Sequence, residues 1–132
     1  MIMIGVNRAI DAQTEIFFVN AIEEIKKTPA GSLIVLEFKE QDLEFYANAD
    51  IEIAVILTNI RDFILCAATK IRYAIARISL AIELQKLADH YLYDTKILAI
   101  APANEIEKIA SLGIDGIFAL DLDAIGVKQS RV

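Results

Sequence analysis

Leu33-Ile34-Val35-Leu36 is the stretch that decides the fold, because it is apolar at every position rather than at alternate ones. A strand with one face in water alternates apolar and polar residues, so this run indicates a strand that is buried on both faces. Similar runs recur along the chain, separated by amphipathic segments. This cadence predicts an α/β domain built as a three-layer α/β/α sandwich, with a five- or six-stranded, mainly parallel sheet. A half-barrel of (βα) units is the alternative.

The expected elements follow from this alternation of apolar runs and amphipathic segments. Strands are predicted at residues 33–38, 51–57, 71–76, 97–101 and 116–120, and helices at 40–48, 60–69, 79–93 and 104–112. Residues 2–6 are expected to form a first strand. A helix is then predicted from Asp11 or Thr14 to about Lys27, although residues 16–19 also fit a strand.

The length predicts a single domain, and the composition predicts that this domain associates with further copies of itself. The 132 residues are predicted to form a single domain, 1–132, too short for a complete eight-fold barrel. The hydrophobic share of 56% exceeds the roughly 45 to 50% usual in globular domains. A small domain has little interior in which to hide this surplus, so we expect a homo-oligomer.

The charge and the cysteine content argue against several classes of partner. The net charge of −6, with basic residues dispersed among acids, disfavours nucleic acid. The longest apolar region, residues 51–69, is interrupted by charged residues, so no membrane span is expected. The only cysteine is Cys66, and the first residues lack the features of a signal peptide, so we expect a cytoplasmic protein.

The helix predicted around residues 62–69 is apolar in nearly every direction. Such a helix is expected to be buried all round. Its outer side either packs on neighbouring helices of the same chain or meets a partner subunit. Phe63, Ile64 and Leu65 are therefore candidate interface residues.

A candidate ligand site lies beyond the carboxyl ends of the predicted strands, where open parallel sheets bind ligands. Thr58, Asn59, Arg77 and Ser79 form a conceivable anion site there. Helix starts near Asn59 and Ser79 would offer free amides, and Arg77 a counter-charge. The same residues also fit a purely structural role, with Asn59 and Ser79 as helix caps and Arg77 paired with Asp121 or Glu105.

No other residue pattern identifies a reaction. His90 is the only histidine, but it is expected on the solvated side of its helix, opposite a stripe of Leu80, Leu84, Leu87 and Tyr91. Cys66 is expected to be a buried, unreactive thiol. Asp121 and Asp123 are too unspecific to predict a Mg²⁺ site. The glycines form no phosphate-binding loop, so no metal and no cofactor is predicted.

One stretch carries a short family resemblance. Residues 105–118, which run from Glu105 through Gly113 and Gly116 to Phe118, combine a helix, a glycine cap and a strand. This unit resembles the closing helix-to-strand unit of phosphate-handling (β/α) barrels, glycerophosphodiester phosphodiesterases among them. The catalytic histidines and early acidic residues of such an enzyme have no counterpart in the chain, so membership of that family is not predicted.

Two functions remain in view from the sequence. The first is a non-enzymatic, cytoplasmic domain whose main interaction is self-association. The alternative is a domain, catalytic or not, that holds an anionic small molecule, such as a phosphorylated metabolite, at the strand ends. A concave pocket with convergent polar groups would favour the ligand, whereas capped and mutually paired residues would favour the scaffold.

Overall fold

The computed structural model describes residues 1–12 and 15–121 of the chain. Its strands are β1 (Ile2–Ile4), β2 (Ile16–Phe18), β3 (Leu33–Glu37), β4 (Glu52–Ile56), β5 (Tyr73–Arg77), β6 (Lys96–Ile100) and β7 (Gly116–Phe118). The α-helices are α1 (Leu43–Asn48), α2 (Ile60–Ala67), α3 (Ile78–Tyr91) and α4 (Ile106–Ser111). Three short 3₁₀ helices are η1 (Ile22–Lys27), η2 (Glu40–Asp42) and η3 (Ala103–Glu105). Asp123 and the chain end at 124–132, expected as a short frayed appendage, lie outside the described residues.

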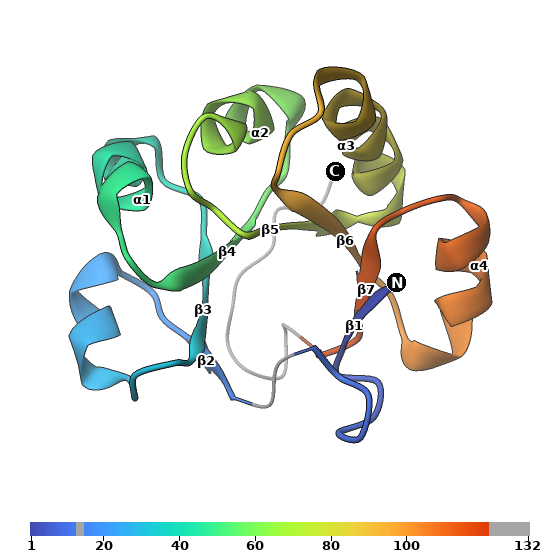
Figure 1. The fold of residues 1–132 in the computed structure, drawn as a ribbon, viewed down its shortest axis with the longest axis horizontal. Coiled ribbons are helices and arrows are strands. Elements are labelled where there is room, and N and C mark those ends of the chain that lie inside the picture. The colour runs from blue at the N-terminus through green and yellow to red at the C-terminus, as the bar shows by residue number, and fades with distance from the viewer. Residues whose placement is uncertain (13–14, 122–132) are drawn as a thin grey trace.

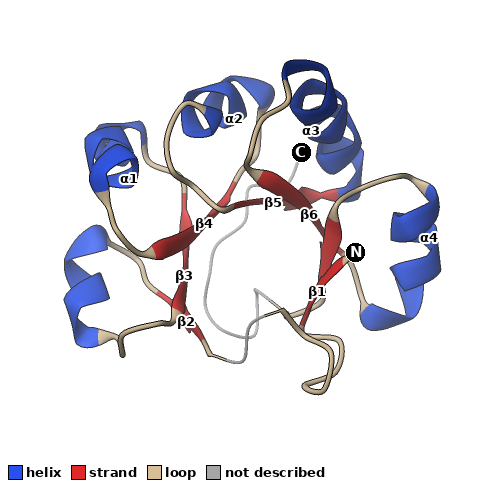
Figure 2. Ribbon diagram, viewed as in Figure 1, coloured by secondary structure: helices blue, strands red, loops and turns tan. Residues whose placement is uncertain are grey.

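All seven strands pair in parallel in the order β1-β7-β6-β5-β4-β3-β2. This order follows the chain around the sheet, as in a barrel, and leaves β1 and β2 as the two edges. Figures 1 and 2 show the strands curling around a common centre, with the helices outside them. The predicted α/β class and parallel sheet are therefore confirmed.

The sheet curls like half of a barrel and does not form the middle layer of a sandwich. In the described part of the chain, the helices lie on the outer face of the sheet (Figure 2), and the sheet has seven strands instead of five or six. The inward side chains of the strands pack on one another and form an apolar cluster of their own. The three-layer arrangement was thus wrong, and the half-barrel alternative describes the fold.

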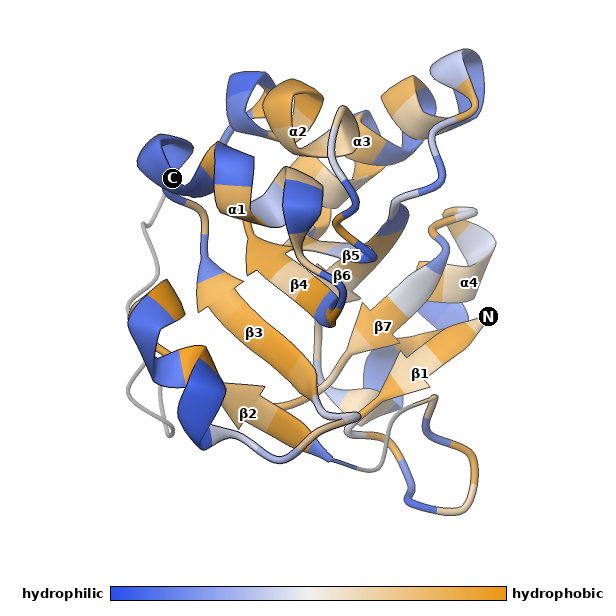
Figure 3. Ribbon diagram, turned by 60° about the vertical axis from the view of Figure 1, so that its left-hand side comes forward, coloured by the Kyte–Doolittle hydropathy of each residue, from blue (hydrophilic) through white to orange (hydrophobic). Residues whose placement is uncertain are grey.

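Two apolar clusters hold the layers together. The outer one joins the outward side chains of the strands to helix residues such as Phe63, Leu84 and Ile109. The inner one consists of strand residues only: Ile4, Leu33, Val35, Ala54, Ile56, Tyr73, Ile75, Leu98 and Phe118. Figure 3 shows the matching pattern, with hydrophobic strands and helices that are hydrophilic in part. Apolar character on both faces of β3 therefore has two separate causes.

The chain between β1 and β3 differs from the prediction. Residues 16–18 form edge strand β2 and only residues 22–27 are helical, as η1, so the long helix was wrong and the strand reading of this run was right. Thr14, one of its two expected caps, is outside the described residues. Aromatic and β-branched residues at 16–19 pair with β3, and this pairing outweighs the helical spacing of the charges that follow.

Candidate functional site

The carboxyl ends of the strands meet at one mouth of the curled sheet, where barrel-like α/β proteins place their ligands. In β3, Leu33 and Val35 belong to the inner cluster, while Ile34 and Leu36 belong to the outer cluster with the helices. Side chains alternate along a strand, so Glu37 at the end of β3 falls on the inner face. In β5, Tyr73 and Ile75 place Arg77 there by the same period.

Glu37 is the unusual residue of this mouth. Its carboxylate oxygen Oε1 is buried and has no hydrogen-bond partner among the described residues. Buried polar atoms nearly always have a partner, because an unpartnered one costs about 1 to 3 kcal/mol. Oε1 of Glu37 is such an atom, and it lies at the end of a strand whose other inner-face residues, Leu33 and Val35, are apolar.

Arg77 ends β5 and immediately precedes α3, with its own side chain exposed. Within the described part of the chain, its guanidinium forms no hydrogen bond or ion pair, so neither Asp121 nor Glu105 is the partner that the structural alternative required. Strands β3 and β5 flank β4, which separates them by about 10 Å. Glu37 and Arg77 therefore stand at the ends of two strands of the inner face, with one strand between them.

The four predicted residues have different roles. Thr58 follows β4, is exposed, and lies at the same mouth as Arg77. Asn59 is the N-cap of α2: its Oδ1 accepts a hydrogen bond from the Asp62 amide (2.8 Å) and its Nδ2 donates to Asp62 Oδ2 (2.9 Å). Ser79 is exposed in the first turn of α3, whose N-cap is Arg77 rather than Ser79.

The structure thus brings Thr58 and Arg77 to one mouth, commits Asn59 to its helix, and adds Glu37. Glu37 lies near the end of the strand predicted at residues 33–38 and was visible in the sequence. The signal that singles it out is the period of two in β3, and this signal becomes informative only once the inner face is known to be closed. Nearby, Lys39 Nζ donates to the backbone oxygen of Asn20 (2.8 Å) and ties the end of β2 to the mouth.

The seam between the two edge strands is also hollowed. A cavity of about 400 Å³ lies between the loop after β1, strand β2 and Leu120. In that loop the Asp11 carboxylate accepts hydrogen bonds from the backbone amides of Gly5, Val6 and Asn7, each at 3.1 Å. The carboxylate of Asp11 therefore organises the loop rather than facing a ligand.

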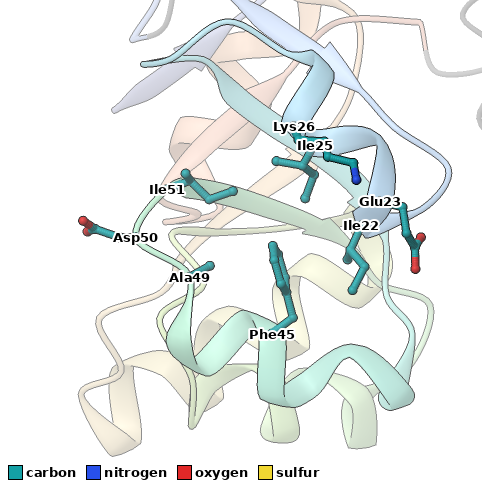
Figure 4. Close-up of a pocket in the computed structure, with 8 residues that line it drawn as sticks. All are labelled: Ile22, Glu23, Ile25, Lys26, Phe45, Ala49, Asp50 and Ile51. Carbon is teal, nitrogen blue, oxygen red and sulfur yellow. The ribbon is translucent and has the colours of Figure 1, made fainter.

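A further cleft of about 440 Å³ lies on the outer side of the sheet, between η1 and α1. Figure 4 shows Ile22, Ile25 and Phe45 lining it, while Asp50 points away from it. Its polar groups stand at the rim and do not converge, so it offers little to orient a polar ligand.

The candidate interface residues on α2 separate into buried and exposed. Phe63 is fully buried and its ring meets that of Tyr93 at 5.8 Å, edge to face. Ile64 is 45% exposed and Ile60 is 40% exposed, whereas Leu65 is half-buried. The expectation that this helix is buried all round is therefore not met by the domain itself.

The remaining titratable residues agree with the sequence in part. His90 is exposed, as predicted, but Tyr91 of the expected buried stripe is 59% exposed. Cys66 is buried, and burial, assisted by the charge of Asp62, raises the pKa of its thiol to about 12. Within residues 1–12 and 15–121, no three His, Cys, Asp or Glu side chains gather as metal ligands would.

Helices in the described part of the chain are too short or too polar to cross a membrane. Comparison with known proteins adds no assignment: no protein-family model, no curated protein and no solved structure matches the chain.

Proposed function

We propose that the domain binds a small anionic molecule, of the phosphorylated metabolite class, at the carboxyl-terminal mouth of the sheet. The observation that carries this proposal is the buried Oε1 of Glu37, at the same mouth as the guanidinium of Arg77, because neither group has a polar partner among the described residues. An arginine at the start of a helix is well suited to a phosphate, because the first backbone amides of α3 add hydrogen-bond donors at the positive end of the helix dipole.

Glu37 narrows the class of ligand. A carboxylate accepts hydrogen bonds, so it suits a hydroxyl group rather than a second anionic group. The lateral separation of about 10 Å between β3 and β5 fits a short molecule with a phosphoryl group at one end and a hydroxyl at the other. Thr58, on the intervening strand end, can donate to either group.

Calorimetric titration with glycerol 3-phosphate tests this function, with glycerol and inorganic phosphate as the two half-ligands. Arg77→Gln is expected to weaken binding at least about tenfold, because a hydrogen bond between charged groups is lost. Glu37→Gln is expected to weaken glycerol 3-phosphate binding several-fold and to leave the weak binding of inorganic phosphate in place.

Arg61→Gln is the matched control, because Arg61 carries the same charge but pairs with Glu40 at 2.7 Å on the outside of the domain. It is expected to bind like the wild type. A panel of sugar and polyol phosphates that produces no rise in melting temperature would contradict the proposal, since a ligand of the native state must stabilise it.

Self-association is a second candidate function, favoured by the exposed Ile60 and Ile64 of α2. These residues are four positions apart and so share one side of the helix. Light scattering after size-exclusion chromatography is expected to show a dimer that Ile64→Glu dissociates without unfolding. A wild-type monomer at micromolar concentration would contradict it. The cytoplasmic location remains a prediction from the sequence.

A further inference from the structure

The opposite, amino-terminal mouth of the sheet holds a cavity of about 660 Å³. It is larger than the clefts of about 440 and 400 Å³ described above. In barrel-like folds this end normally serves stability, whereas ligands bind at the other end. Here it remains hollow, and three of its lining residues are cations: Lys70, Arg72 and Lys96.

Strand pairing brings these cations together. Lys96 is the register partner of Tyr73, and its backbone amide donates to the Arg72 oxygen at 3.0 Å. Leu98 belongs to the inner cluster, so the period of two places Lys96 on the inner face as well. Lys70 lies three residues before Tyr73, the first residue of β5. Lys70 and Arg72 thus reach the cavity from the loop between α2 and β5, and Lys96 reaches it from the start of β6.

The charges around the cavity are only partly compensated. The Arg72 guanidinium forms an ion pair with Glu52 and lies 5.2 Å from the centre of the Tyr73 ring. These contacts fix its position, and the Glu52 carboxylate compensates part of its charge. Lys70 and Lys96 are exposed, and neither forms an ion pair in the part of the chain that the structure describes. Asp94 is the one acid that lines the cavity.

Three convergent cations are unexpected in a chain with a net charge of −6, because on average its surface repels anions. We propose that the amino-terminal mouth is a second binding site, which takes a compact anion with three or more negative charges. A lysine pair and a fixed arginine match such an anion, since each supplies one charge-assisted hydrogen bond. Asp94 opposes the bound anion at close range.

Calorimetric titration with pyrophosphate and with citrate, at constant ionic strength, tests the second site. The two probes distinguish phosphoryl from carboxylate recognition. Lys70→Gln and Lys96→Gln are each expected to weaken binding of the preferred probe at least about tenfold. Asp94→Asn is expected to tighten binding several-fold, because a like charge is removed. A merely structural role of these residues would not produce opposite effects.

Lys108→Gln, a substitution of an exposed lysine on α4, is the matched control and should bind like the wild type. Arg77→Gln should also bind like the wild type, so this site and the proposed carboxyl-terminal site can fail independently. Absence of binding by both probes would overturn the proposal. Equal weakening by Lys96→Gln and Lys108→Gln would overturn it too, as would an Asp94→Asn variant that binds no more tightly than the wild type.

Discussion

The two faces of the sheet are equally apolar but are buried by different means. The outer face packs against four α-helices, and its cluster mixes residues of strands and helices. The inner face forms a separate cluster, and among the described residues the buried members of this cluster all belong to strands. The difference teaches that a continuous apolar run predicts burial of both faces of a strand without predicting what covers each one.

The two ends of the inner face differ from its middle in polarity. The middle is wholly apolar, whereas Glu37 and Arg77 stand at one end and Lys96 at the other. Among the described residues, the charged side chains of the inner face thus lie at its two ends. Both proposed sites follow from this arrangement.

The largest expected effect is the loss of stability when one large buried side chain is removed from each face of the sheet. Phe118 is fully buried inside the curl, and Phe63 is fully buried under α2. Phe118→Ala and Phe63→Ala are each expected to lower the free energy of unfolding by about 3 to 5 kcal/mol, through lost apolar burial and the cavity left behind. Urea denaturation measures both. A cost below about 1 kcal/mol for Phe118→Ala alone would mean that the inner face is not a packed core.

A smaller effect is expected at Gly116 of β7, where the curl brings neighbouring strands close. A Cβ there would overlap the backbone oxygen of Ile2 and lie 2.6 Å from the Leu98 side chain. Gly116→Ala is expected to cost about 1 to 3 kcal/mol, because the β1 backbone must move.

Gly31→Ala serves as the comparison for Gly116→Ala. A Cβ added at Gly31 meets no atom within 4 Å, but the residue has a φ of +84°. The substitution should cost about 1 kcal/mol from backbone strain alone. Thermal denaturation followed by circular dichroism would measure the pair, and a Gly116→Ala protein as stable as the wild type would count against the close approach of β1 and β7.

The smallest effect concerns the outer face and its dependence on pH. The pKa of Cys66 rises from 9.0 to about 12 on folding, chiefly through burial. The unfolded chain therefore loses this proton first, and the stability that the neutral thiol contributes is complete below pH 9 and declines between pH 9 and about 12. Between pH 8 and pH 10 the wild type should lose about 1 kcal/mol more than Cys66→Ala, as measured by urea denaturation at each pH. Identical losses in the two proteins would show that the thiol is accessible in the native state.

Most elements from β3 to β7 could be predicted, because each strand is a compact apolar run and each helix follows a distinct amphipathic pattern. Two features depend on tertiary structure: the first was predicted only as an alternative, and the second was not predicted. Residues 16–18 become a strand only through pairing with β3, and Tyr91 is exposed because α3 ends there, with Leu92 at a positive φ of 56°. The curl itself has no local signature, since both architectures bury both faces.

The positions of the candidate residues at strand ends could be predicted from the sequence, whereas binding of a ligand there stays a prediction. Placing the candidate site at the carboxyl ends of the strands identified Thr58 and Arg77, since those residues follow directly from strand ends. Asn59 was included although its cap with Asp62 uses its side chain. The cations at the other mouth were not considered, because they precede their strands and gather only when β5 and β6 pair.

The most direct test of the central claim is a titration of the ¹⁵N-labelled protein with glycerol 3-phosphate, followed amide by amide. The account predicts chemical-shift changes concentrated at Phe38, Thr58 and Ser79, which persist in Lys96→Gln and disappear in Arg77→Gln. Shift changes that survive Arg77→Gln, or that concentrate at Arg72 and Lys96 instead, would contradict a ligand site at the carboxyl-terminal mouth.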